Sequence, residues 1–92
     1  MLLPSCNTPS QAAYERQVNA AVAPGMRADQ AEVALARIGF SCFRSGASAD
    51  DCTKHTADKV IATCIQHVVL HYEPSETRLA SVETRPLACV GP

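Results

Sequence analysis

Five cysteines in a chain of 92 residues constrain this protein more than any other feature of its sequence. Cytosolic proteins seldom carry so many cysteines without a metal, whereas exported proteins join them in disulfides. Cys6 lies apart near the N-terminus. Four cysteines lie in the body of the chain and can form two disulfides in three alternative ways: Cys42, Cys52, Cys64 and Cys89. The sequence therefore predicts a disulfide-stapled protein that works outside the reducing cytoplasm.

The length and composition indicate one small globular domain, expected over residues 8–92 after a tail of residues 1–7. Apolar residues make up 47% of the chain and charged residues 18%, which is typical of a folded protein. The net charge is −1 and there is no basic run, so nucleic-acid binding is not expected. No segment approaches the roughly 20 apolar residues of a membrane helix. Any membrane attachment is expected to be through a lipid anchor.

Two helices are expected in the first half of the chain. Residues 8–11 resemble a capped helix start, and an apolar stripe at helical spacing follows them. A second helix is expected over residues 28–38, with Gly39 as a left-handed cap and Phe40 packing back on Leu35. Asp29 and Glu32 near the start of this helix and Arg37 near its end suit the helix macrodipole. The stripe of the first helix consists of Tyr14, Val18, Ala21 and Val22.

After Phe40 the apolar spacing changes to that of strands. We expect a short strand at 40–44, a polar loop at 45–58, a long strand at 59–72 and a returning strand at 78–84. Residues 85–92 are expected to be a tail. The order predicts an α+β fold in which two N-terminal helices pack on one face of a three-stranded antiparallel meander.

The register of the last hairpin and the faces of the long strand follow from alternation. If Tyr72 faces Arg78, then Leu70 meets Ala80 on the face that packs against the helices. The same register places Cys64 opposite Pro86, three residues before Cys89, and so favours a Cys64–Cys89 disulfide.

The opposite face of the long strand is unexpectedly apolar for a free sheet face. This face predicts a contact surface for another protein, or for a second copy in a homodimer. The alternative is that the C-terminal tail, with Leu87 and Val90, covers it. The predicted surface consists of Ile61, Ile65, His67 and Val69.

Catalytic and metal sites are not expected. Cys52 with His55, and Cys64 with His67, have a spacing that zinc sites use. However, Cys64 and His67 are an odd number of residues apart on a strand and therefore point to opposite faces. There is no nucleophile motif and no phosphate-binding glycine loop, and the acidic pair at 50–51 is typical of a solvated turn. The sequence predicts no enzyme, no metal and no cofactor.

The segment 25–31, Gly-Met-Arg-Ala-Asp-Gln-Ala, resembles the element that begins the second helix in an exported superfamily. That superfamily comprises small outer-membrane assembly lipoproteins of the SmpA/OmlA type and the repeats of the β-lactamase inhibitor protein. Arg27 replaces the usual Ser or Thr cap, and Ala31 stands where Val is expected. The resemblance covers roughly residues 10–84. It implies a helix-helix-sheet unit and a local Cys42–Cys52 disulfide.

The segment Leu3-Pro4-Ser5-Cys6 resembles a bacterial lipobox, in which the cysteine is acylated. Only five residues precede Cys6, fewer than a signal peptide needs. Either the start is truncated, or Cys6 is an ordinary tail cysteine. The resemblances together imply a periplasmic or outer-membrane protein-protein interaction module. We expect a structural or assembly lipoprotein of the bacterial envelope. The alternative is an inhibitor or immunity-type protein that blocks a secreted or periplasmic enzyme.

Overall fold

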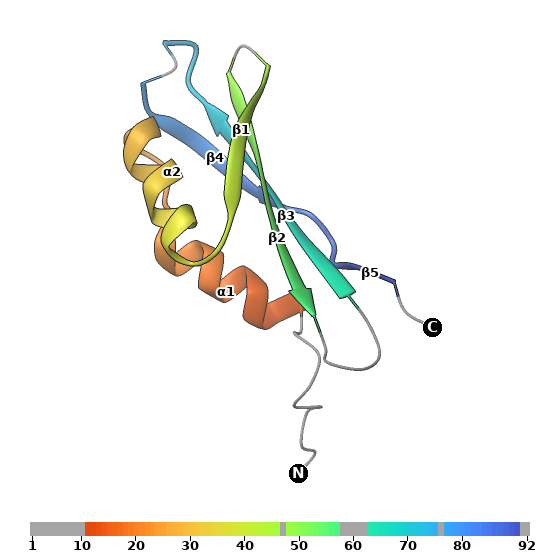
Figure 1. Cartoon of the computed structure of the whole chain (residues 1–92). Coiled ribbons are helices and arrows are strands. Elements are labelled where there is room, and N and C mark those ends of the chain that lie inside the picture. The colour runs from red at the N-terminus through yellow and green to blue at the C-terminus, as the bar shows by residue number, and fades with distance from the viewer. Residues whose placement is uncertain (1–10, 47, 58–62, 76, 91–92) are drawn as a thin grey trace.

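The computed structural model describes residues 11–46, 48–57, 63–75 and 77–90 (Figure 1). Two helices lie against one face of a five-stranded antiparallel sheet. The helices are α1 (Gln11–Ala21) and α2 (Ala28–Arg37), and the strands are β1 (Ser41–Gly46), β2 (Ala49–Ala57), β3 (Thr63–Tyr72), β4 (Leu79–Thr84) and β5 (Ala88–Val90). Both predicted helices are confirmed. Residues 8–10, where the first was expected to begin, lie outside the described part.

The end of α2 follows the predicted capping pattern. Gly39 adopts a φ of +101°, in the left-handed region that favours glycine. The amide of Phe40 donates to the carbonyl of Leu35 at 3.0 Å, and the amide of Gly39 donates to that of Ala36 at 3.1 Å. These two bonds form the Schellman ending. They turn the chain directly from α2 into β1.

The sheet has more strands than a three-stranded meander, so that prediction is wrong. The strands lie in the order β1-β2-β3-β4, and β5 pairs with the first part of β3. The polar segment 45–58, predicted to be a loop, contains the nine-residue strand β2. Its polar residues suit a strand because Asp51, Thr53 and His55 alternate onto the sheet face that the helices leave open. The polar composition of segment 45–58 therefore led to the wrong prediction of a loop.

The hairpin of β3 and β4 also differs from the predicted register. Tyr72 lies opposite Leu79, not Arg78, and a bulge follows between His71 and Tyr72. The bulge adds Ala80 to β4, so later pairs are shifted by two residues from the predicted ones. Residues 88–90 of the predicted tail form β5 and extend the sheet beside β3.

Both disulfides join residues that lie directly opposite each other on neighbouring strands. Cys42 is bonded to Cys52 between β1 and β2, and Cys64 is bonded to Cys89 between β3 and β5. This is the pairing expected from the sequence. Two disulfides indicate an oxidising, exported environment. Cys6 lies outside the described residues.

The core lies between the helices and the sheet face toward them, called the inner face; the opposite face is the outer face. Even-numbered residues of β3 face inward, as predicted, and Val68 and Leu70 are fully buried. Ile38 and Val82 are half-buried at the border of the core. The core cluster consists of Tyr14, Val18, Val22, Ala31, Leu35, Phe40, Cys52, Val68, Leu70, Tyr72 and Leu79.

Candidate functional site

The outer-face residues predicted to bind a partner lie on β3, except for Ile61, which lies outside the described residues. Ile65 and His67 are half-buried, and Val69 is only 6% exposed. Residues 88–90 of the C-terminal tail pair with β3 within the sheet, so this described part of the tail is not a further layer over the outer face. Of the described members, Val69 offers little apolar surface to a partner.

Polar side chains surround Val69 on the outer face. Its cross-strand neighbours are Asp51 on β2 and Glu83 on β4. His67 Nε2 lies 2.7 Å from Asp51 Oδ1, and His71 Nε2 lies 3.0 Å from Glu83 Oε1. These hydrogen bonds hold the pKa of Asp51 and the pKa of Glu83 below their usual values. The carboxylates of this face are therefore satisfied within the chain.

The residues of the zinc hypothesis do not come together as ligands. Cys52 and Cys64 are each bonded in a disulfide, so neither offers a thiolate to a metal. His55 and His67 lie on the outer face, whereas both cysteines face inward. Within the described ranges, no group of three or more His, Cys, Asp or Glu side chains is placed to hold a metal ion.

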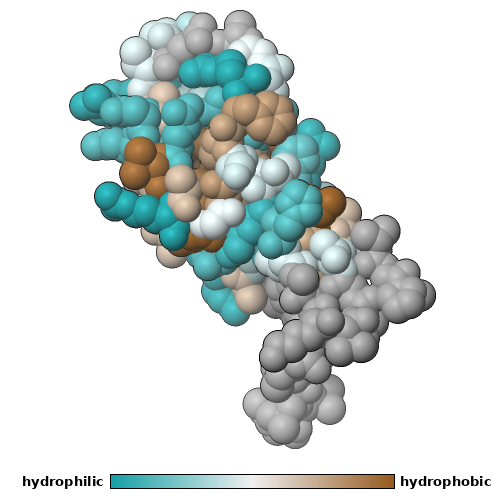
Figure 2. Space-filling model, viewed as in Figure 1, coloured by the Kyte–Doolittle hydropathy of each residue, from teal (hydrophilic) through white to brown (hydrophobic). Residues whose placement is uncertain are grey.

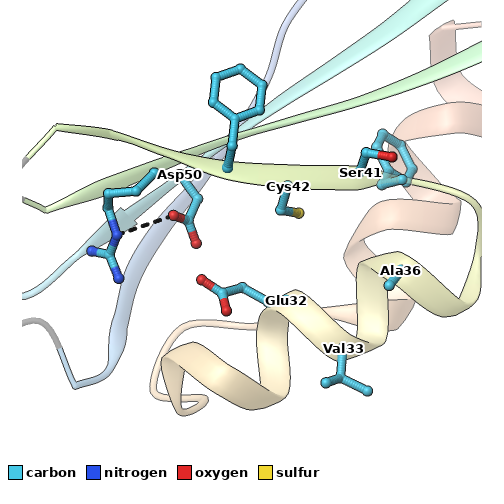
Figure 3. A pocket seen from close by; sticks show the side chains of 9 residues that line it. Glu32, Val33, Ala36, Ser41, Cys42 and Asp50 are labelled. Carbon is cyan, nitrogen blue, oxygen red and sulfur yellow. Dashed lines mark ion pairs between the residues drawn. The ribbon is translucent and has the colours of Figure 1, made fainter.

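A second candidate site is a hollow of about 520 Å³ between α2 and β1, called here the acid hollow (Figure 3). Glu32, Val33 and Ala36 of α2 line one side, residues 40–44 line the other, and Asp50 of β2 completes it. Figure 3 shows the carboxyl groups of Glu32 and Asp50 pointing toward one another. Two acidic groups from separate elements therefore meet at one place.

Asp50 is the most buried charged group of this hollow, with 1% of its surface exposed. The Tyr72 hydroxyl donates to Asp50 Oδ2 at 2.5 Å, and Arg44 Nε lies 3.3 Å from Asp50 Oδ1. The Arg44 guanidinium also lies over the Tyr72 ring, 5.2 Å from its centroid. Burial, and then the hydrogen bond to the Asp50 carboxylate, raise the pKa of Tyr72, so the hydroxyl keeps its proton.

Glu32 has the strongly perturbed carboxyl of the hollow. Its hydrogen bond with Asp50, and then partial burial, raise the pKa of Glu32 to about 7. Asp29 acts in the same direction, and the positive charge of Arg44 acts against it. The Glu32 carboxyl therefore exchanges a proton near neutral pH.

The register of β2 explains why the sequence did not reveal this site. Asp50 lies opposite Arg44 on one side and Leu70 on the other, both on inward positions. Read as a turn, the pair at 50–51 has no preferred face. Read as a strand, Asp50 shares the face of Cys52, two residues later. That alternation toward a disulfide cysteine is the signal that would have placed Asp50 inside.

The amino-acid sequence and the fold were compared with known proteins. No protein-family model, no curated protein and no solved structure matches this chain. Among the described residues, no helix is long and apolar enough to cross a membrane.

Proposed function

We propose that this chain is an exported protein-protein interaction module that docks its partner over the mouth of the acid hollow. The observation that carries the proposal is the placement of two apolar side chains. Among the described residues, Val33 and Phe43 are the exposed large hydrophobic ones, at 50% and 60%, and both border the hollow. Figure 2 shows apolar atoms exposed over the region of α2 and β1. Large apolar side chains that stay exposed beside one hollow indicate a surface that a partner covers.

The position of β1 supports the same surface. β1 is the edge strand of the sheet and pairs with β2 alone among the described strands. An edge strand offers backbone groups to a partner segment, in addition to its side chains. The outer face offers less, because its carboxylates are paired with histidines and Val69 is buried. Such a module needs no catalytic residue.

The proposed cellular location, periplasmic or outer-membrane, rests on the sequence resemblances. The segment 25–31 and the lipobox-like residues before Cys6 support a periplasmic or outer-membrane assembly lipoprotein. An inhibitor or immunity-type protein would instead carry an unmodified Cys6. Mass spectrometry of the protein isolated from its native cells tests this choice. A diacylglyceryl group on Cys6 supports the lipoprotein, and an unmodified Cys6 contradicts it.

The docking surface is tested by two charge substitutions and a matched control. Val33→Glu and Phe43→Glu each place a charge at the mouth, and we expect each to weaken partner capture by at least about tenfold. Ala20→Glu introduces the same charge at an exposed position of α1 and should leave capture unchanged. Ile65→Lys tests the outer face. If Ile65→Lys loses the partner while both mouth variants keep it, the docking surface lies on the outer face instead.

A further inference from the structure

The two edges of the sheet differ in how they are covered. At the β4 edge, the segment that leads into α2 supplies backbone hydrogen bonds. The amide of Gly25 donates to the carbonyl of Leu79, and the amide of Leu79 donates to the carbonyl of Met26, both at 2.7 Å. At the other edge, β1 pairs with β2 alone among the described strands, and all its residues except the half-buried Cys42 are exposed. β1 is therefore the edge to which another strand can be added.

The backbone of Cys42 points toward this open side. Cys42 and Cys52 lie directly opposite each other on β1 and β2, and their Cα atoms are 4.0 Å apart. So short a separation is typical of the antiparallel pairs that exchange no hydrogen bonds across the two strands. The N–H and C=O groups of Cys42 therefore point away from β2, to where a neighbouring antiparallel strand would bond them.

The side chains of β1 leave room for such a neighbour. Phe43 lies opposite Asp51 and so belongs to the outer face, which it shares with Ser41 and Ser45 because side chains alternate along a strand. None of these three residues of β1 is charged. The charged residue of the strand, Arg44, lies on the inner face and pairs with a buried carboxylate. Beneath the strand lies the acid hollow (Figure 3), so α2 does not fill the space below this edge.

The residues of β1 are arranged symmetrically about Phe43. If a second copy lies antiparallel with its Phe43 opposite the first, Ser41 of each chain faces Ser45 of the other. The same register places Cys42 opposite Arg44, so the two arginines are not directly opposed. Phe43, which is 60% exposed, then meets its counterpart at the short spacing of a pair without hydrogen bonds, where aromatic rings can pack. β1 is therefore complementary to itself in this register.

We infer that β1 is the pairing site for a second copy of this chain, in a symmetric dimer whose two β1 strands join two sheets into one. Phe43 lies at the two-fold axis of this dimer. The inference rests on the proposed function, because it names the partner that covers Phe43. Two-fold pairing uses the β1 edge of both chains, so the assembly closes at two copies. The alternative occupant of the edge is an extended segment of a different protein.

Sedimentation equilibrium of the disulfide-bonded full chain, with the Cys6 thiol alkylated so that it links no chains, tests the dimer. We expect the mass to rise with concentration to twice that of one chain. Phe43→Glu removes the aromatic pair and opposes two like charges, so self-association should weaken by at least about tenfold. Ala20→Glu adds the same charge on α1 and should leave self-association unchanged. A native chain that stays monomeric up to about 1 mM would overturn the inference.

An exchange of charge at position 43 tests the register. Phe43→Glu and Phe43→Lys should each self-associate weakly. Their mixture should form a mixed dimer about fivefold more tightly than either variant alone, because opposite charges then face each other. The control pair is Ser81→Glu with Ser81→Lys, at an exposed position on the outer face of β4, and mixing should not change its association. No gain on mixing the two position-43 variants would contradict pairing about Phe43.

Amide hydrogen exchange tests the backbone bonds. Exchange of the Cys42 amide should slow by at least about tenfold as the chain becomes dimeric, because its N–H then donates to the second copy. Exchange of the Phe43 amide, which points toward β2, should change less. If amides on the outer face of β3 slow while that of Cys42 does not, the two copies meet through the outer face and the inference is wrong.

The outcomes distinguish this inference from the proposed function. If the native chain is monomeric but Val33→Glu and Phe43→Glu lose a captured partner, the docking surface is supported and pairing with a second copy is wrong. If the native chain dimerises through position 43 but both mouth variants still capture the same protein from an envelope extract, the dimer is supported and the proposed docking surface is wrong.

Discussion

Asp50 and Asp51 are neighbours in the sequence, yet they lie on opposite faces of the sheet and behave differently. Asp50 faces inward with 1% of its surface exposed, and its partners are the Tyr72 hydroxyl and Arg44. The side chain of Asp51 faces outward, is 25% exposed and pairs with His67. One residue type therefore makes a buried contact and a solvated contact within the same strand.

The difference shows that burial and the neighbouring charge decide what a carboxylate does. On the outer face, a histidine hydrogen bond in contact with solvent lowers the pKa of Asp51. On the inner face, the Asp50 carboxylate lies beside a second acid and raises the pKa of Glu32 to about 7. The outer carboxylate therefore stays ionised to lower pH than usual, whereas on the inner face Glu32 holds its proton to higher pH than usual.

The largest expected effect contrasts hydrophobic residues on the two faces of β3. Leu70 is fully buried on the inner face, so Leu70→Ala should lower the free energy of unfolding by about 2–4 kcal/mol. Ile65 is half-buried on the outer face, and Ile65→Ala should cost about 1 kcal/mol because less apolar surface is lost. Urea denaturation measures both. Equal losses would show that the outer face is packed as tightly as the core.

The second contrast concerns the two aspartates themselves. Asp50→Ala leaves the buried Tyr72 hydroxyl without its acceptor and should cost about 1–3 kcal/mol. Asp51→Ala breaks a partly solvated pair and should cost about 0–1 kcal/mol. Denaturation of the two variants under the same conditions gives the comparison. A larger loss for Asp51→Ala would reverse the assignment of the buried and the solvated face.

The elements with a clear apolar pattern could be predicted from the sequence. The stripe through Tyr14 and Val18 predicts α1, Gly39 predicts the end of α2, and the alternation through Val68 and Leu70 predicts the inner face of β3. These predictions hold because each pattern reports burial of the residues that form it. Both disulfides are present, but the resemblance implied Cys42–Cys52, and the Cys64–Cys89 expectation came from a hairpin register that the structure corrects.

The remaining features depend on contacts that one sequence pattern does not contain. β2 was missed because its exposed residues are polar and resemble a loop, and the bulge at Ala80 has no glycine to mark it. The acid hollow was missed for the same reason, since Glu32 and Asp50 meet only once β2 is a strand. The outer face was expected to be more apolar because the sequence of β3 alone shows Val69 without its neighbour Glu83.

A smaller contrast compares two buried tyrosine hydroxyls. The Tyr72 hydroxyl donates to a carboxylate, and the Tyr14 hydroxyl donates to the backbone carbonyl of His67 at 2.7 Å. Hydrogen bonds to charged groups are stronger, so Tyr72→Phe should cost about 1.5 kcal/mol and Tyr14→Phe about 1 kcal/mol. Thermal or urea denaturation of the two variants tests the order. A smaller loss for Tyr72→Phe would indicate that solvent satisfies Asp50.

The smallest expected effect is the pH dependence that Glu32 gives to stability. Its pKa is about 7 in the folded chain against an ordinary value of 4.5, so the folded chain binds a proton that the unfolded chain has lost between these values. This contribution is complete below pH 4.5 and is lost as the pH rises through about 7. Asp51 and Glu83 have lowered pKa values, so their contribution is lost as the pH falls through those values, outside this window.

In Glu32→Gln, stability should therefore fall less steeply between pH 4.5 and about 7 than in the native chain. The difference should be less than about 1 kcal/mol because the Glu32 carboxyl is partly solvated. Urea denaturation at several pH values measures it, with Asp29→Asn as the control that keeps the native slope. Parallel curves for the native chain and Glu32→Gln would mean that the pKa of Glu32 is not raised in the folded protein.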